Sequence, residues 1–277
     1  MRVERLGDGD DEPELAVVAA VHGDEPCGVR AIERLVDERP AVERPVKLIV
    51  ANERAVERNV RYTEADLNRV FPGDPDAPEY ERRLAPELLR EVRGCTTLSL
   101  HSTQSFDRPF AVVEADDPLA AAICPYLSIE AAVDVGGFGE GRLIDYADVI
   151  EVECGLQNSE GAAENAYELI GEFLTAVGAL PGERPDARRV PIYQLERRIP
   201  KDPAEEYGVL VENFERVAAG TTFATAGEHE LVADEPFYPV LLSSYGYQEE
   251  FGYAAERIGD FDRNPVETGR GSHAGAQ

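Results

Sequence analysis

A histidine and two acidic residues stand together in the stretch Val21-His22-Gly23-Asp24-Glu25, which follows an apolar run at residues 15–20. A neutral imidazole and a carboxylate three residues apart, where a buried strand would give way to a loop, can both bind one metal ion. On its own, such a histidine is as readily explained as a hydrogen-bonded loop or core residue. The pair therefore predicts half of a zinc site, whose other half has to come from elsewhere in the chain.

Two further residues of the same chemistry lie where other buried strands are expected to end. His101 follows the segment 96–100, and Glu153 lies near the end of the segment 148–154. Open α/β sheets bind their ligands at the carboxyl ends of the strands, so we expect these side chains to meet His22 and Glu25 there. Two histidines and one glutamate make a ligand set of the catalytic zinc type, which leaves a fourth position for water. A further carboxylate that binds no metal would then serve as a general base.

The chain contains only 4 histidines, and the other two, His229 and His273, fall in a β-rich part and in the tail. His22 and His101 are therefore the only histidines that could share a site in the first part of the chain.

A long polar connection, residues 52–73, lies between these two histidines, and long connections inside compact domains are usually functional. It carries Arg61, Asn68 and Arg69, which no apolar periodicity explains as core residues. Guanidinium groups near a metal are suited to bidentate capture of a substrate carboxylate. Arginines in an acidic protein can equally form surface ion pairs, so a role in substrate binding is a hypothesis.

The segments that must position these residues alternate between strand and helix. Strands are expected at 15–21, 46–51, 96–100, 110–114 and 148–154, and helices at 26–37, 79–92, 118–124 and 160–177. Such an alternation predicts an α/β domain over residues 1–180, with a mixed, largely parallel sheet flanked by helices. The glycine cluster at 136–141 does not have the spacing of a dinucleotide-binding or P-loop motif and is interpreted as a flexible loop.

After Gly178 the pattern changes to short β-like runs separated by turns. Residues 181–186 have the composition of a linker, and the runs lie at 190–195, 208–211, 221–224 and 240–243. We predict a small β-rich C-terminal domain at 188–259, followed by a disordered tail at 260–277 that is polar and rich in glycine.

The composition is that of a globular protein, with 277 residues and 43% hydrophobic content, except in its charge. The chain has 55 acidic and 27 basic residues, a formal net charge of -28, and lysine only at Lys47 and Lys201. Salt at molar concentration screens such self-repulsion, so the composition predicts a halophilic protein. The lack of a basic patch argues against a nucleic-acid partner.

No apolar run is long enough for a membrane span, and no apolar signal-peptide core follows the first residues, so we expect a cytoplasmic protein without a membrane partner. The 4 cysteines, Cys27, Cys95, Cys124 and Cys154, form no Cys-x-x-Cys pair. We therefore expect buried free thiols, which fit a reducing compartment.

Taken in order, the motifs of residues 15–180 resemble the succinylglutamate desuccinylase and aspartoacylase family, which is related to the zinc carboxypeptidases. The resemblance rests on His22-Gly23-Asp24-Glu25 with Gly28, Asn52-Glu53-Arg54-Ala55, Arg61-Tyr62, Asp66-Leu67-Asn68-Arg69-Val70-Phe71, His101-Ser102-Thr103, and Val152-Glu153-Cys154-Gly155-Leu156-Gln157.

The resemblance implies a zinc-carboxypeptidase-like (phosphorylase/hydrolase-like) catalytic domain and a small β domain that covers its cleft. It implies one zinc ion per chain, bound by His22, Glu25 and His101, with Glu153 activating a water. Arg61, Asn68 and Arg69 would hold a substrate carboxylate or polarise the scissile carbonyl, and Arg142 and Tyr247 would add substrate contacts. The expected reaction cleaves the amide bond of an N-acyl amino acid, such as N-succinylglutamate or N-acetylaspartate, to a carboxylate and a free amino acid.

The sequence departs from the family pattern at two places and leaves alternatives open. The substrate-binding arginine that the family has about ten residues before the catalytic glutamate is matched only loosely by Arg142. Family members usually have an acid two residues before the third ligand, where this chain has Ser99. Glu151 competes with Glu153 for the role of base, because side chains two apart on a strand share a face. A zinc carboxypeptidase acting on small peptides, a deacylase for another N-acylated molecule and a non-catalytic metal-binding module are the alternative functions, and a homo-oligomer stays open.

Overall fold

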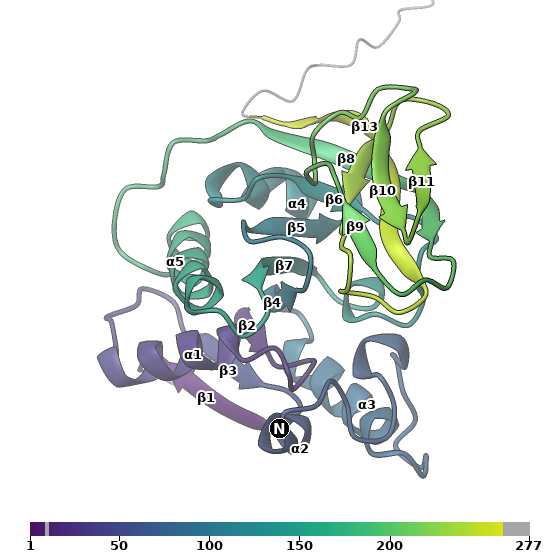
Figure 1. The fold of residues 1–277 in the computed structure, drawn as a ribbon. Helices are drawn as coiled ribbons and strands as arrows, with labels where there is room; N and C mark the ends of the chain where they lie inside the picture. The colour runs from purple at the N-terminus through teal and green to yellow at the C-terminus, as the bar shows by residue number, and fades with distance from the viewer. Residues whose placement is uncertain (9–10, 263–277) are drawn as a thin grey trace, which may run out of the picture.

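The computed structural model describes residues 1–8 and 11–262, and one long, mixed β-sheet runs through this part of the chain (Figure 1). Ten described strands form it in the order β1-β3-β2-β4-β7-β5-β6-β8-β13-β12, and β11-β10-β9 form a separate antiparallel sheet. The strands of the long sheet are β1 (Arg2–Leu6), β2 (Leu15–Ala19), β3 (Val46–Val50), β4 (Thr96–Thr103), β5 (Phe110–Val113), β6 (Ala132–Asp134), β7 (Val149–Leu156), β8 (Val190–Pro200), β12 (Tyr238–Val240) and β13 (Glu250–Phe261). The small sheet contains β9 (Tyr207–Val209), β10 (Thr222–Ala226) and β11 (His229–Val232).

Helices cover both faces of the N-terminal half of the long sheet (Figure 1). The α-helices are α1 (Cys27–Glu38), α2 (Glu53–Arg58), α3 (Tyr80–Val92), α4 (Pro118–Ile123) and α5 (Glu160–Ala176), and the 3-10 turns are η1 (Leu67–Arg69), η2 (Cys124–Tyr126) and η3 (Leu143–Asp145). Core residues of α1 and α5 form one cluster with the sheet, whereas α3 and η1 pack against the opposite face. The predicted α/β architecture is confirmed.

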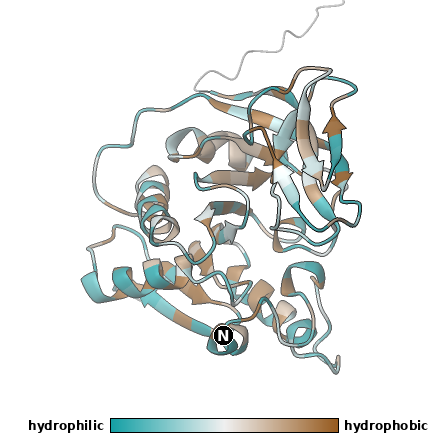
Figure 2. Ribbon diagram, viewed as in Figure 1, coloured by the Kyte–Doolittle hydropathy of each residue, from teal (hydrophilic) through white to brown (hydrophobic). Residues whose placement is uncertain are grey.

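Strand β2 shows why this part of the chain forms a buried parallel strand. Its residues are all buried, with Leu15, Val17 and Ala19 in the core under α1 and α5, and Ala16 and Val18 in the core under α3. A strand between two covered faces needs apolar residues at every position, and its parallel neighbours are β3 and β4. Figure 2 shows the same pattern as hydrophobic residues along the central strands.

The parallel strands β2, β4 and β7 lie side by side, and their carboxyl ends meet at one edge of the sheet. His22 follows β2, while His101 and Glu153 lie near the carboxyl ends of β4 and β7 and are paired in register. The topology therefore brings residues that are far apart in sequence to one place.

The C-terminal part joins the long sheet as well as forming a sheet of its own. Strand β8 pairs in parallel with β6, and β13 pairs with β8 over most of its length. The sequence analysis did not predict β13, whose pairing with β8 shifts register at three places. These irregularities disturb the alternation by which a strand is recognised in a sequence. Strand β13 extends to Phe261, and residues 263–277 of the expected tail lie outside the described residues.

All four cysteines are free and buried, as expected. No helix within the described ranges, 1–8 and 11–262, is long and apolar enough to cross a membrane.

Candidate metal and active site

The loop after β2 is shaped by close contacts that explain the glycines of its motif. The backbone turns at Ala20, whose φ is 55°, and Gly23 then passes against α2. A Cβ at Gly23 would lie 2.1 Å from the carbonyl carbon of Ala55, so only glycine fits there. A Cβ at Gly28 would lie 2.8 Å from the Cβ of Ala19 and 2.9 Å from that of Leu100, so glycine lets α1 pack directly on β2 and β4. These contacts hold His22 and Glu25 at the edge of the sheet.

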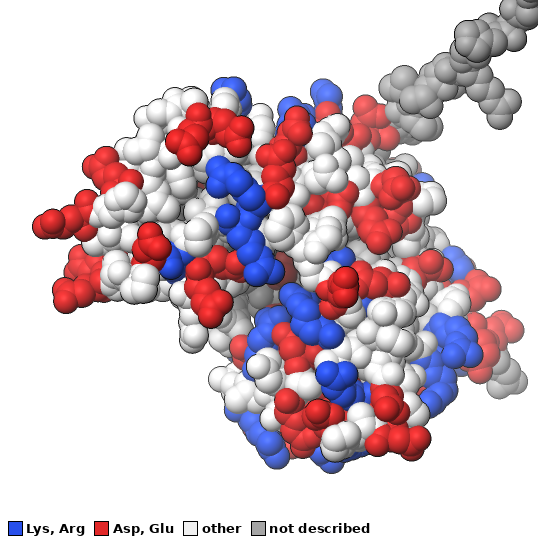
Figure 3. All heavy atoms as spheres, turned by 90° about the vertical axis from the view of Figure 1, so that its right-hand side faces the viewer, with Lys and Arg blue, Asp and Glu red and all other residues white. Residues whose placement is uncertain are grey.

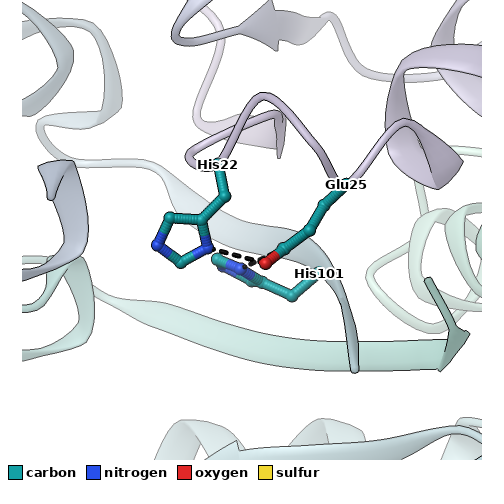
Figure 4. A group of neighbouring side chains, drawn as sticks. All are labelled: His22, Glu25 and His101. Atoms are coloured by element: carbon teal, nitrogen blue, oxygen red, sulfur yellow. Dashed lines mark hydrogen bonds and ion pairs between the residues drawn. The ribbon is translucent and has the colours of Figure 1, made fainter. Parts of the chain in front are cut away.

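Three candidate metal ligands meet at this edge (Figure 4). His22, Glu25 and His101 are buried, and one potential ligand atom from each lies within 4.8 Å of the others. The Glu25 carboxylate stands between the imidazoles, with Oε1 2.8 Å from His22 Nδ1 and Oε2 3.1 Å from His101 Nδ1. Two imidazole nitrogens and a carboxylate oxygen are the donors of catalytic zinc sites. The residues present therefore fit a zinc ion.

The electrostatics of the group also suit a cation. Burial by itself would raise the pKa of Glu25, but His22 and His101 hold the pKa of this carboxyl well below its usual range. Burial works in the opposite direction on His101, and the hydrogen bond and negative charge of Glu25, with Glu151 and Glu153 nearby, raise its pKa to about 10. The Glu25 carboxylate thus stabilises positive charge on the two histidines.

Each histidine has a second polar neighbour behind its ring. His22 Nε2 lies 3.1 Å from Asp66 Oδ1, whose other oxygen accepts a hydrogen bond from Arg61 Nε at 2.9 Å. Burial opposes ionisation of Asp66, but the hydrogen bond with His22 and the charges of His22 and Arg61 keep its pKa well below the usual range. His101 Nε2 lies 3.1 Å from Ser99 Oγ. Partners of this kind fix the orientation and tautomer of metal-binding histidines.

Glu153 lies beside the three candidate ligands without a fixed partner. Its Oε2 is buried and has no hydrogen-bond partner among the described residues. Burial, together with the negative charge of Glu25, raises its pKa to about 7. A carboxylate with such a pKa and with an oxygen that has no partner in the described structure, beside a donor set, is suited to accept a proton near neutral pH.

The predicted substrate-binding residues occupy different places around this group. Arg61 Nη1 lies 3.5 Å from Glu25 Oε1, next to the candidate ligands. Arg69 is exposed, donates to the carbonyl oxygen of Asn68 and has no acidic partner among the residues described. Arg142 is buried and donates to Asp145 Oδ1 at 3.0 Å, while its Nε is left without a partner in the described structure.

Gly139 lies between Arg69 and Arg142. A Cβ on it would be 3.8 Å from both Arg69 Cζ and Arg142 Cδ. Both arginine side chains therefore lie next to the glycine-rich segment at 136–141, which the sequence predicted as a loop.

Asn68 and Tyr247 are both tied to elements that line the site. The Asn68 amide donates to Glu151 Oε1 at 3.2 Å and accepts from the backbone N–H of Leu143 at 2.9 Å. The Tyr247 hydroxyl lies 3.4 Å from Thr103 Oγ1 at the end of β4, and burial, with the charge of Glu153, raises its pKa to about 12. The C-terminal part of the chain therefore reaches the strand that carries His101. The roles of these residues toward a substrate stay predictions.

The sequence analysis assigned no role to Glu81, a fully buried carboxylate of α3 that holds the loop beside the candidate site. It accepts hydrogen bonds from the backbone N–H groups of Thr63, Glu64 and Ala65, at 2.7, 3.1 and 3.1 Å, and from the Asn52 amide. These bonds fix the loop that carries Arg61 and Asp66. The only sequence signal was an acid on the apolar side of a helix.

Replacing Glu81 by alanine should therefore destabilise the protein and loosen this loop. Several buried donors would lose their acceptor, and we expect the free energy of unfolding to fall by about 3 kcal/mol. Denaturant unfolding of Glu81→Ala measures this loss, with Glu87→Ala, an exposed acid on the same helix, as the control. Equal stabilities for the two variants would contradict the supporting role.

Comparisons with known proteins agree with this geometry. Residues 11–107, which include all three candidate ligands, match the family model of the succinylglutamate desuccinylase/aspartoacylase catalytic domain. The family resemblance is confirmed. No curated protein matches the chain by sequence.

Solved structures of this family share the fold of the chain. The ectoine utilization protein EutE (DoeB) from Ruegeria pomeroyi is 20% identical, with a TM-score of 0.73 over 92% of this chain and 87% of its own. A succinylglutamate desuccinylase/aspartoacylase from Rhodobacter sphaeroides is 17% identical, with a TM-score of 0.73 over 92% and 89% of the two chains. Murine aminoacylase 3 is 20% identical, with a TM-score of 0.65 over 90% and 97%. At these identities the likeness establishes the desuccinylase/aspartoacylase fold.

Proposed function

We propose that this protein is a zinc-dependent deacylase that hydrolyses the amide bond of an N-acyl amino acid to a carboxylate and a free amino acid. The observation that carries the proposal is the buried His22, Glu25 and His101 donor set beside the unpartnered Glu153 carboxylate. The match to a catalytic domain of desuccinylases and aspartoacylases supports the same reaction class.

In the proposed mechanism, His22, Glu25 and His101 would hold the zinc ion. When bound, zinc supplies Lewis acidity and makes a neighbouring water more acidic. Glu153 accepts the proton of the attacking water on its free oxygen and later gives that proton to the leaving amino group. Arg61, next to Glu25, stabilises the negative charge that develops on the carbonyl oxygen of the substrate.

The arginines around the site favour a substrate with carboxylate groups. Arg69 and Arg142 both lie next to Gly139, and guanidinium groups bind carboxylates through paired hydrogen bonds. In Figure 3, basic side chains gather on both sides of a hollow, on a face that is otherwise rich in acidic residues. Because the chain has a net charge of -28, local positive charge is needed to attract an anion. This local charge supports an N-acylated acidic or otherwise carboxylate-bearing amino acid as substrate.

The activity should fall at acidic pH as Glu153 becomes protonated. Its raised pKa means that the carboxylate, the form that accepts a proton, disappears below about pH 7. A bound cation lowers this value, because it stabilises the carboxylate. We expect an acidic limb of kcat/KM with an apparent pKa between 4.5 and about 7. A pH profile of the zinc-loaded enzyme measures it, and an activity that stays constant down to the lower value would remove Glu153 from the role of base.

A screen of the zinc-loaded protein against N-acyl amino acids and dipeptides, at low and at molar salt, tests the function. Release of free amino acid from N-acetyl or N-succinyl derivatives would support the proposal. Cleavage of dipeptides alone would favour a carboxypeptidase, and bound zinc without turnover of either class would favour a metal-binding module.

A further inference from the structure

Glu151 is a buried carboxylate for which the proposed mechanism has no use. It lies on β7 two residues before Glu153, and its side chain faces the same side of the strand. In the parallel register between β4 and β7, Ser99 is paired with Glu151 and His101 with Glu153. The four side chains thus form two rows on one face of the sheet, with Ser99 and Glu151 one step further from the strand ends.

The contacts place Glu151 behind the His101 ring. His101 Nδ1 faces Glu25, and so the candidate metal position, at 3.1 Å from Glu25 Oε2. The opposite nitrogen, Nε2, lies 3.1 Å from Ser99 Oγ and 4.0 Å from Glu151 Oε1. When Nδ1 binds a metal, Nε2 carries the ring proton and donates it to the serine hydroxyl. Glu151 adds a negative charge 4.0 Å from the same nitrogen.

The other candidate histidine has a carboxylate in the equivalent place. His22 Nε2 lies 3.1 Å from Asp66 Oδ1, on the side of the ring away from Glu25. Asp66 is within hydrogen-bond distance of His22 Nε2, whereas at His101 Nε2 this place is taken by the hydroxyl of Ser99. Both histidines therefore have an acid behind the nitrogen that is turned away from Glu25.

Asn68 connects these two carboxylates. Its backbone N–H donates to Asp66 Oδ1 at 3.0 Å, and its side-chain amide donates to Glu151 Oε1 at 3.2 Å. The same Glu151 oxygen is the one nearest to His101 Nε2. The amide therefore fixes the position of the Glu151 charge relative to the ring, and one residue of η1 holds the acids behind both histidines.

From this arrangement we infer that Glu151 is a positioning residue for His101: held by Asn68 with its Oε1 4.0 Å from His101 Nε2, it orients and polarises the imidazole for metal binding, and it is not the general base. The inference rests on the proposed metal site. A base must reach the attacking water, whereas Glu151 lies on the side of the ring away from Glu25 and is already bonded to Asn68. Glu153, one step nearer to the strand end and with a free oxygen, is the carboxylate left for that task.

The test is the zinc affinity of the purified full chain, measured by competition with a chromophoric chelator. Glu151→Gln keeps the size of the side chain and removes its charge, and we expect zinc affinity to fall by about 10- to 100-fold. In the double variant Ser99→Asp, Glu151→Gln, a carboxylate returns from the paired position on the neighbouring strand, next to His101 Nε2. We expect this variant to recover most of the lost affinity, which a merely structural role of Glu151 would not produce.

Two controls separate this effect from general damage. Glu172→Gln removes the charge of a half-buried carboxylate on α5 that is hydrogen-bonded to Ser128 away from the site, and it should leave zinc affinity unchanged. Thermal melting of the metal-free variants shows whether each one is folded. If the double variant does not fold, the single variant Ser99→Asp takes its place. This single variant should bind zinc at least as tightly as wild type.

Wild-type zinc affinity in Glu151→Gln, or failure of a folded Ser99→Asp, Glu151→Gln variant to bind zinc better than Glu151→Gln, would overturn the inference. Unchanged zinc affinity with loss of turnover in Glu151→Gln would make Glu151 the base. Zinc binding is read without any substrate, so a wild-type protein that binds zinc but turns over no N-acyl amino acid would sink the proposed function and leave this inference standing.

Discussion

Glu153→Gln is expected to lower kcat by about 1,000-fold while the protein keeps its zinc. The substitution preserves the size of a side chain that lies beside the candidate ligands but is not one of them. It removes the group that we propose accepts the proton of the attacking water, because an amide cannot take up a proton near neutral pH.

Single-turnover and steady-state kinetics of zinc-loaded Glu153→Gln, with zinc content from elemental analysis, measure this effect. Glu160→Gln, an exposed acid at the start of α5, is the matched control and should keep wild-type turnover. Near-normal turnover in a zinc-loaded Glu153→Gln variant would move the base to another residue. Loss of zinc together with turnover would instead place Glu153 among the metal ligands.

His101→Ala should lose both zinc and activity. One of three donors disappears, and the Glu25 carboxylate loses the imidazole 3.1 Å from its Oε2. Substitution of a residue that only hydrogen-bonds to a metal ligand lowers metal affinity by up to roughly 100-fold. Because His101 is itself a candidate ligand, we expect zinc affinity to fall by more than this. His229→Ala, which changes an exposed histidine of the small sheet, is the control and should retain one zinc per chain. Full zinc content in His101→Ala would exclude this histidine as a ligand.

Much of the fold could be predicted because burial leaves a local pattern. The predicted strands at 15–21, 46–51 and 96–100 correspond to β2, β3 and β4, since a strand covered on both faces is apolar at every position. By contrast, β6 has only three residues, and β13 has an irregular register with β8, so neither leaves a clear period.

Some residues of the candidate site could likewise be predicted from the sequence, and others could not. His22, Glu25 and His101 were predicted as neighbours because each follows or ends a buried strand, and the structure brings their ligand atoms within 4.8 Å. Asp66 and Glu81 received no role, since their partners lie in segments that come together only when the polar connection folds over α3. Contacts between such distant segments leave no periodic pattern in the sequence from which they could be predicted.

The sequence by itself determined the type of fold and the chemical identity of the candidate donor set. Apolar runs reveal which strands are buried, and parallel strands place their carboxyl ends together. The family resemblance favoured Glu153 over Glu151 as the base, but only the tertiary structure shows that these two carboxylates, on the same face of one strand, have different contacts. Glu151 is bonded to Asn68 and lies 4.0 Å from the far nitrogen of His101, whereas Glu153 has an oxygen without a partner. The difference comes from strand register and from a loop that closes over the sheet, neither of which local periodicity records.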